Sequence, residues 1–466
     1  MAPWIGGLLV LAVALTCYLP GLGATVVQRE QELRVALTAR AMAEGGSWLA
    51  PTYLGSPRYR KPPLQYWLVA SAYRAGGATD SAFLARLPSA TAGAALAFLT
   101  WLLARSWMSG RGALVAGLSC ATCFILLKQS RLAETDVPLA LWSALAAWGG
   151  YRVLFEGKDL RWMLLAGLAS GLGFLTKGPA ALALPVAAWI AFAVSARARP
   201  TPRTWGSLAC WITLAALIAL PWYAWLLSRA DTLAQLQAEL SATFGEETQH
   251  PGPWFYYIYT FLHAFAPWSL LLPPALWLAW REGRTTPGLR FAWLWFVTGF
   301  VILSATSSKQ IHYTTLLVVP ASLLVGWYVP LLSERLRWSR QTFSRALASA
   351  LLVLLLLHLL TSTVIMPRQE KRQLIRDLAL AHRESIRASR EFFLVGRHRA
   401  TLEFHAGRPV RDMDSLREAF RHAQPGDLVF LNTRGAELAD PGTRFERIEE
   451  RTRGDFRCAL WRVRGL

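Results

Sequence analysis

The chain has 466 residues and a formal net charge of +20, and 54% of its residues are hydrophobic while only 17% are charged. Soluble domains carry about 25% charged residues, so this composition excludes an ordinary soluble enzyme and indicates a membrane protein. The positive charge does not indicate nucleic-acid binding. The basic residues are scattered through short loops between apolar runs, where the cytoplasmic bias of Lys and Arg explains them.

The apolar runs predict a polytopic α-helical membrane protein with about eleven transmembrane helices. Residues 3–22 lack the basic region of a signal peptide and form a longer apolar run, so we expect an uncleaved first span. The expected spans are 4–23, 86–104, 112–128, 136–154, 162–175, 179–195, 206–228, 257–280, 291–306, 313–332 and 345–366.

A long loop, residues 24–85, separates the first two spans. Residues 30–43 predict one helix in it, and residues 64–75 (LQYWLVASAYRA) predict a second. The second segment has about 12 residues and is too short to span a bilayer. We expect both helices to lie in the membrane interface. The alternative, a further span at 64–75, would invert the sidedness of everything after it and place the basic loops outside.

Short basic loops follow the even-numbered spans. They hold fourteen basic residues: Arg105 and Arg111; Lys158 and Arg161; Arg197, Arg199 and Arg203; Arg281, Arg284 and Arg290; and Arg335, Arg337, Arg340 and Arg345. The positive-inside rule assigns these loops to the cytoplasm. We therefore expect a bacterial inner-membrane protein with a cytoplasmic N-terminus, and with residues 24–85 and the C-terminal domain on the periplasmic side.

The pattern changes at residue 367, which divides a transmembrane catalytic domain (1–366) from a small C-terminal α/β domain (367–466). Residues 369–390 and 414–423 predict helices, whereas 391–395 and 427–432 predict buried strands. Residues 444–463 resemble a closing hairpin with its turn at Arg453-Gly454-Asp455. None of these residues forms a recognisable catalytic constellation.

Ionisable residues recur at the outer ends of the predicted spans. Charge near hydrocarbon is costly and is usually retained for function. Solvated loop residues are the alternative, but Lys177 and Lys309 each lie in a very short turn between long apolar runs. Transfer of a group from a lipid phosphate would use this arrangement, because Lys or Arg stabilises the leaving phosphate and a carboxylate takes the acceptor's proton.

Several motifs then resemble the bacterial aminoarabinose transferases and the related protein mannosyltransferases, which are GT-C-class glycosyltransferases using polyprenyl-phosphate sugars. The motifs cover about 300 residues and are ELRVALTARAMAEGGSWLAP (32–51), KPPLQYW (61–67), ETDVPLA (134–140), GLGFLTKGP (171–179), HPGPWFYY (250–257), APW (266–268) and SSKQIHY (307–313). The resemblance implies an inverting glycosyltransferase whose partners are a polyprenyl-phosphate-linked sugar donor, membrane lipids and an acceptor that is lipid A, a glycan, a protein or another lipid.

The resemblance also implies the site residues. In that family an Asp-Glu pair precedes Arg34 and the Asp is the favoured base, but the pair here is Gln31-Glu32, so Glu30 and Glu32 remain alternative bases. Only one is expected to face the substrate, because residues two apart do not share a helix face. Asp136 matches the second acidic residue of the family, and the resemblance implies that it is a catalytic residue that orients the acceptor or assists the base. Residues Arg60, Lys61, Lys177 and Lys309 are expected to contact the donor phosphate, and Arg34, His250 and Tyr313 match further positions near the site.

Some relatives carry a metal-binding Glu immediately before the KPP lysine, and this chain has Arg60 there. An arginine favours phosphate over a cation, so we expect no required cofactor or metal. Two other classes of function remain as alternatives. A lipid-linked sugar transporter or flippase would show internal repeats and ionisable groups near the midplane, and a non-catalytic scaffold would explain the missing first-loop Asp.

Overall fold

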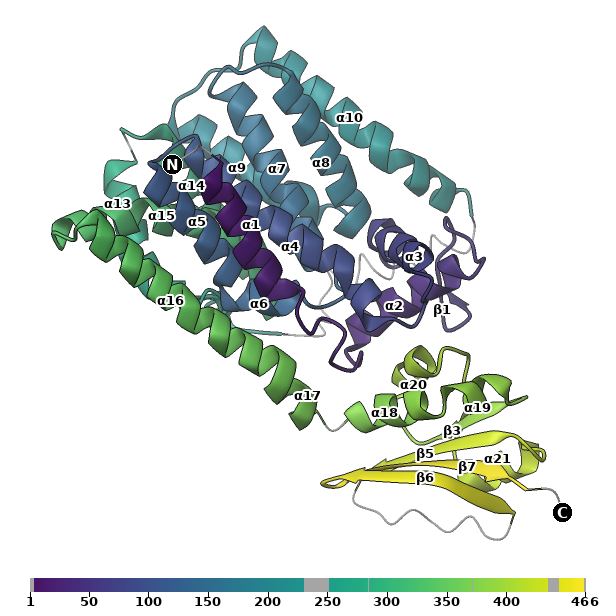
Figure 1. Cartoon of the computed structure of the whole chain (residues 1–466). Coiled ribbons are helices and arrows are strands. Elements are labelled where there is room, and N and C mark those ends of the chain that lie inside the picture. Colours follow the sequence, from purple (N-terminus) through teal and green to yellow (C-terminus); the bar gives the residue numbers. More distant parts are fainter. Residues whose placement is uncertain (1–3, 230–250, 284, 371, 435–443, 465–466) are drawn as a thin grey trace. The chain divides into compact units, whose positions relative to one another are not determined.

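Long apolar helices account for most of the chain, which we describe from a computed structural model (Figure 1). The structure describes all residues except 1–3, 230–250, 284, 371, 435–443 and 465–466. The contacts divide the chain into two units, which we call the helical unit (Met1–Pro20, Arg58–Gln65 and Leu87–His358) and the mixed unit (Gly21–Pro57, Tyr66–Arg86 and Leu359–Leu466).

The helical unit contains most of the α-helices. Their bounds are α1 (Ile5–Tyr18), α4 (Ala82–Arg105), α5 (Gly110–Thr122), α6 (Phe124–Gln129), α7 (Asp136–Leu154), α8 (Arg161–Lys177), α9 (Ala180–Ser195), α10 (Pro202–Leu227), α12 (Tyr256–Ala264), α13 (Leu272–Glu282), α14 (Pro287–Ala305), α15 (Val318–Arg335) and α16 (Arg340–Leu360). Two 3₁₀ helices, η1 (Trp268–Leu271) and η2 (Ile311–Leu317), precede α13 and α15. Helix α8 packs on both α7 and α10, α14 packs on α9, and α15 packs on α5.

Small residues let these helices approach closely. Gly167 and Gly171 of α8 are one turn apart and face α10, where an added Cβ would come within 3.0 Å of Leu214 and 2.7 Å of Ile218 respectively. This Gly-x-x-x-Gly spacing is a frequent contact surface between membrane helices, because it allows two backbones to come together. The sequence of α8 therefore specifies which of its faces meets α10.

Within the described residues, five helices are long and apolar enough to cross a membrane, or six if the bent pair α12 and η1–α13 counts as one span. The five are Ala82–Arg105, Pro202–Leu227, Pro287–Ala305, Ile311–Arg335 and Arg340–Gln369, and two shorter apolar helices are Ile5–Tyr18 and Ala180–Ser195. The chain is thus a predominantly helical, multi-pass membrane protein, as its composition predicts.

Two expected spans are not continuous helices. Residues 112–128 divide into α5 and α6 at Cys123, whose backbone is extended, and the N–H of Phe124 donates to the carbonyl of Ala266 at 2.9 Å. Residues 257–280 divide after α12, and the segments on either side of the break meet at 118°. Proline explains the second break, because Pro267 has no N–H to continue the α-helical hydrogen-bond pattern.

The mixed unit begins with the loop elements α2 (Glu30–Ala43), β1 (Thr52–Tyr53), β2 (Ser56–Pro57) and most of α3 (Leu64–Gly76). Helices α2 and α3 occupy the ranges expected from the sequence. Strands β1 and β2 form a short antiparallel hairpin whose turn residues, Leu54 and Gly55, both have positive φ. A two-residue turn of this kind matches the right-handed twist of the strands it joins.

The C-terminal part of the mixed unit is a five-stranded sheet with helices on both faces. After the π-helical residues Thr361–Ile365 come α17 (Met366–Gln369), α18 (Gln373–Ala381), α19 (Arg383–Ala388), β3 (Phe392–Val395), α20 (Arg399–Ala406), β4 (Arg411–Met413), α21 (Leu416–His422), β5 (Leu428–Arg434), β6 (Phe445–Arg453) and β7 (Phe456–Val463). The strand order is β4-β3-β5-β7-β6, with β3 parallel to β4 and β5 and the remaining pairs antiparallel.

Strand β3 is buried on both faces. Phe392 and Leu394 pack against α18 and α20, whereas Phe393 and Val395 pack on the side of α21. This explains its uninterrupted apolar sequence, which is typical of a parallel strand covered by helices on both sides. The sequence predicted β3, β5 and the hairpin of β6 and β7, but it did not predict α20 and β4, which have only eight and three residues.

Candidate functional site

An ion pair between Asp136 and Lys177 is the centre of the polar cluster in the helical unit. The ammonium Nζ of Lys177 donates to Oδ1 of Asp136 at 2.7 Å, and the side chains are 17% and 8% exposed respectively. Asp136 is the first residue of α7 and Lys177 the last residue of α8. Each charge therefore has the sign that its helix dipole favours. The two motifs ETDVPLA and GLGFLTKGP meet through this contact.

Three further side chains of the cluster lie around this pair. The Lys177 ammonium is 4.6 Å from the centre of the Tyr313 ring, which belongs to η2. Lys61 and His312 both lie within electrostatic range of the Asp136 carboxylate. Tyr313, His312 and Lys61 come from the SSKQIHY and KPPLQYW motifs, so four segments that are distant in the sequence supply one polar cluster.

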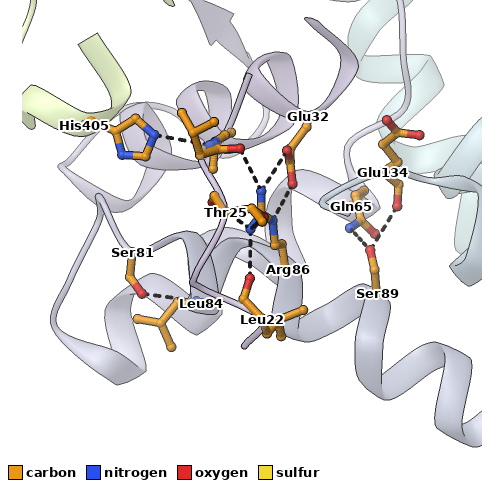
Figure 2. Close-up of polar contacts among 12 residues, drawn as sticks. Leu22, Thr25, Glu32, Gln65, Ser81, Leu84, Arg86, Ser89, Glu134 and His405 are labelled. Atoms are coloured by element: carbon orange, nitrogen blue, oxygen red, sulfur yellow. Dashed lines mark hydrogen bonds and ion pairs between the residues drawn. The ribbon is translucent and has the colours of Figure 1, made fainter. Parts of the chain in front are cut away.

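A buried chain of amides and carboxyls continues from this cluster. Glu134 lies within electrostatic range of Lys177, and its Oε2 accepts a hydrogen bond from Gln129 at 3.3 Å. The Ser89 hydroxyl donates to the Glu134 carbonyl at 3.1 Å and accepts from Gln65 at 3.4 Å (Figure 2). Gln65 follows Lys61 by four residues, so this chain links the KPPLQYW motif to the α6–α7 turn.

Lys309, an expected phosphate contact, binds two backbone carbonyls in this structure. Its ammonium donates to the carbonyls of Ser304 at 2.8 Å and Thr306 at 2.6 Å, at the C-terminal end of α14, and the residue is only 7% exposed. Lysine side chains commonly satisfy the last carbonyls of a helix in this way. These bonds fix the turn between α14 and η2, which carries Tyr313.

The HPGPWFYY motif packs against the same turn. Pro251 and Ser308 form an isolated antiparallel bridge, and the Tyr257 hydroxyl both accepts from the backbone N–H of Gln310 at 3.2 Å and donates to its carbonyl at 3.4 Å. His250, the first residue of the motif and a predicted site residue, lies outside the described residues. The structure therefore gives the setting of this motif but not the position of its histidine.

In the mixed unit, Glu32 forms a buried ion pair with Arg86. Their side chains are 1% and 2% exposed, and Nε and Nη2 of Arg86 lie 2.7 Å and 3.1 Å from the two carboxylate oxygens (Figure 2). Arg86 also donates to the carbonyls of Leu22, Thr25 and Val26. All the donor positions of the guanidinium are thus engaged, and the pair joins α2 to the preceding loop.

Glu30, the other candidate base, has a different environment. It begins α2, its side chain is 57% exposed, and its Oε1 lies 2.8 Å from Nε of Arg34. The Tyr53 hydroxyl donates to the same oxygen at 3.5 Å. An exposed carboxylate at a helix N-terminus can accept a proton from a bound molecule, whereas a carboxylate saturated by a buried arginine cannot do so without breaking that pair.

His405 adjoins the same loop and was missed by the sequence analysis. It is 2% exposed, and its Nε2 accepts a hydrogen bond from the backbone N–H of Val27 at 3.2 Å (Figure 2). Burial lowers the pKa of His405 well below its usual value, and the positive charges of Arg376, Arg86 and Arg40 lower it further. The imidazole is therefore neutral near pH 7.

The sequence did not single out Arg86, which begins the expected span 86–104. One signal could have singled it out, because an arginine at the start of an apolar run is rarely buried without a partner. Arg60 is exposed. Within the described ranges no three His, Cys, Asp or Glu side chains come close enough to hold a metal ion, and the metal requirement stays a prediction.

The sequence of this chain is similar to known glycosyltransferases. The family described as dolichyl-phosphate-mannose-protein mannosyltransferase matches residues 60–225. The undecaprenyl phosphate-alpha-4-amino-4-deoxy-L-arabinose arabinosyl transferase of Pseudomonas aeruginosa (strain UCBPP-PA14) is 33% identical over 303 residues, which cover 63% of this chain and 54% of that protein. The second such enzyme of Proteus mirabilis (strain HI4320) is 30% identical over 341 residues, or 70% and 59% of the two chains. The chain thus spans little more than half the length of these curated relatives.

The fold is also similar to a solved structure. The crystal structure of ArnT from Cupriavidus metallidurans bound to undecaprenyl phosphate matches with a TM-score of 0.78 at 19% identity, covering 100% of each chain. At this identity the match is evidence of a shared fold. In sequence and in fold, the chain therefore resembles the GT-C glycosyltransferases of the bacterial aminoarabinose transferase and protein mannosyltransferase-related group, as its motifs predict.

Proposed function

We propose that this protein is an inverting glycosyltransferase that moves a sugar from a polyprenyl-phosphate carrier to an acceptor at the outer face of the bacterial inner membrane. The relatives' names supply the class of donor, and 4-amino-4-deoxy-L-arabinose is the sugar that those names carry. The observation that carries the proposal is the Asp136–Lys177 pair with Tyr313 beside it and Lys61 within electrostatic range.

Cationic side chains near the Asp136 carboxylate suit a phosphate leaving group. A lysine ammonium has three N–H donors, and the hydrogen bond from Lys177 to Asp136 uses one. In the proposed reaction Lys61 and Lys177 stabilise the negative charge on the carrier phosphate as the bond from the anomeric carbon to the phosphate oxygen breaks. Asp136 positions Lys177, and exposed Arg60 adds positive charge next to Lys61. Lys309 holds the turn before η2, the helix that bears Tyr313, and acts as a positioning residue.

A carboxylate of α2 supplies the base. The acceptor oxygen attacks the anomeric carbon on the side opposite the phosphate, so configuration inverts, and its proton passes to the carboxylate. We assign this role to Glu30, because Glu32 is saturated by Arg86 while Glu30 is exposed beside Arg34 and Tyr53. His250 is proposed as a further residue of the site on its motif alone, and no metal is required.

The proposal includes the finer topology. About eleven spans within residues 1–366 would place the N-terminus in the cytoplasm, and the outer loop 24–85 and residues 367–466 in the periplasm. A cysteine introduced at the exposed Glu384 should then react with a membrane-impermeant maleimide in spheroplasts, and one at the exposed Arg161 should react only after the membrane is permeabilised. The opposite labelling would contradict this orientation.

The function is tested with the purified full chain in nanodiscs. It is incubated with undecaprenyl-phosphate 4-amino-4-deoxy-L-arabinose and lipid A, with and without EDTA, and products are identified by mass spectrometry. We expect a glycosylated acceptor in both reactions, and no product from Lys61→Ala or Asp136→Ala, each folded as judged by its thermal midpoint. Full activity of both variants would overturn the site assignment. Flipping of the labelled carrier lipid across the bilayer without any product would favour a transporter.

A further inference from the structure

Residues 24–28 lead into α2, and their backbone forms hydrogen bonds with side chains of the C-terminal part of the mixed unit. Oε1 of Gln373 accepts from the backbone N–H of Val26 at 3.1 Å, and its Nε2 donates to the carbonyl of Ala24 at 3.3 Å. His405 accepts from the N–H of Val27 at 3.2 Å. Val26 and Val27 are 3% and 0% exposed. A buried N–H without a partner costs about 1–3 kcal/mol, so these side chains stabilise this segment.

The far end of α2 is held by the same part of the chain. Arg40, only 6% exposed, donates to the carbonyls of Glu403 at 2.8 Å and Phe404 at 2.5 Å, and its guanidinium lies 5.0 Å from the centre of the Phe404 ring. The same guanidinium donates to the carbonyl of Thr79 at 3.0 Å. Arg40 thus satisfies carbonyls in the last turn of α20 and connects α2, α20 and the segment after α3.

Helix α2 is therefore fixed at its beginning by Gln373 and His405, in its first turn by Arg86, and at its end by Arg40. Three of these contacts, those of Gln373, His405 and Arg40, involve α18 or α20, and α18 begins seven residues after the last predicted span. The proposed base Glu30 stands only three residues after Val27, at the first position of α2. A shift of residues 24–28 would move the start of the helix and its carboxylate together.

We propose that the C-terminal part of the protein positions the base of the transfer reaction, with Gln373 and His405 as positioning residues that hold the entry to α2. This inference rests on the proposed function and gives the C-terminal residues a role in catalysis although none of them touches the reacting atoms. Gln373 and His405 bind the backbone of residues 24–27. The interaction therefore tolerates changes in the side chains of those residues but not the loss of Gln373 or His405.

The test compares matched variants in the full-length protein. Gln373→Leu and His405→Leu remove the acceptors of the Val26 and Val27 amides, whereas His405→Gln restores an acceptor at a similar reach. Asp427→Asn is the control, because Asp427 is also buried and accepts from backbone amides, but from those of Glu391 at 3.1 Å and Gln424 at 2.8 Å and not from residues 24–28.

We expect both Leu variants to lower kcat about ten- to hundredfold, as displacement of a catalytic group by about 1 Å does, with the donor KM within about twofold of the wild type. His405→Gln should recover most of the kcat, and Asp427→Asn should keep it even if its thermal midpoint falls. An unchanged kcat in both folded Leu variants overturns the inference. An equal loss of kcat in Asp427→Asn also overturns it, because the effect would then reflect general destabilisation.

A second measurement is independent of activity. Hydrogen–deuterium exchange of residues 24–43 should be faster in Gln373→Leu and His405→Leu than in the wild type, and unchanged in Asp427→Asn. If the wild type transfers no sugar, the proposed function fails, and exchange still decides whether the C-terminal residues hold α2. Unaltered exchange in both Leu variants overturns the positioning role whatever the enzyme's substrate.

Discussion

Two ion pairs of this protein have the same charges but opposite surroundings. Glu32 and Arg86, in the mixed unit, are almost completely buried, and the guanidinium also binds three backbone carbonyls. In the pair of Asp136 and Lys177, in the helical unit, Asp136 is buried but the Lys177 side chain is partly accessible, and its ammonium lies against the Tyr313 ring. We call this the accessible pair. Arg86, whose donors are all engaged, holds the loop before α2 in place. Lys177, which is partly accessible, can instead bind a ligand. These surroundings distinguish Glu32 from Asp136, although the sequence predicted both as site residues.

The largest expected effect is on stability, from breaking the buried pair. Arg86→Met leaves the Glu32 carboxylate buried without its partner and removes donors from the carbonyls of Leu22, Thr25 and Val26, so it should cost about 3–5 kcal/mol. Glu32→Gln should cost less, because the arginine keeps those carbonyls. Denaturant titration in detergent measures both.

The double variant sharpens this test. Arg86→Met combined with Glu32→Gln should be less destabilising than the sum of the two single changes, because the residues interact directly. Additive costs, or a loss below about 1 kcal/mol for Arg86→Met, would contradict the description of this pair as a structural link between α2 and the loop before it.

The second effect is on catalysis, from the accessible pair. Lys177→Met should lower kcat about 10²–10³-fold, the loss typical of removing one group that stabilises transition-state charge. Its cost to stability should be smaller than that of Arg86→Met, since Lys61 and His312 still lie within electrostatic range of Asp136. Lys177→Arg is the control for charge alone. Wild-type kcat in Lys177→Met would remove Lys177 from the proposed site.

The sequence predicted the helices that carry Asp136 and Lys177 and pointed to both residues as site candidates, but it did not predict their contact. Asp136 and Lys177 lie at helix ends beside apolar runs, where composition and short turns mark them. The contact between Glu32 and Arg86 joins residues 54 positions apart, and no local pattern encodes such a pairing. His405 lies in α20, an eight-residue helix too short to give a clear periodic signal. The break at Pro267 was missed because the apolar composition continues across it.

The third effect is a pH dependence of stability, caused by His405 in the mixed unit. The pKa of His405 is lowered in the folded protein by burial and by three arginines, while the unfolded chain should titrate near 6.5. Below that pH the unfolded chain binds a proton that the folded state excludes, so stability falls as pH falls, by at most about 1.4 kcal/mol per pH unit for one such group.

Thermal midpoints of the wild type and His405→Gln between pH 7.5 and pH 5 measure this effect. The glutamine cannot bind the proton, so the variant should lose less stability on acidification than the wild type does. Parallel curves for the two proteins would show that His405 does not contribute to the pH dependence. In that case only hydrogen–deuterium exchange would test the hydrogen bond between His405 and Val27.

The smallest effect tests the aromatic side of the accessible pair. A cation–π contact is worth about 0.5–1 kcal/mol at a partly exposed site, so Tyr313→Leu should lower kcat about two- to fivefold through a less well-fixed Lys177 ammonium. Tyr313→Phe keeps the ring at 4.6 Å from Nζ and should retain most of the activity. A loss in Tyr313→Phe as large as in Tyr313→Leu would mean that the hydroxyl acts instead of the ring. In that case we would assign the Tyr313 hydroxyl a hydrogen bond to the donor, and Tyr313 would be a donor-binding residue.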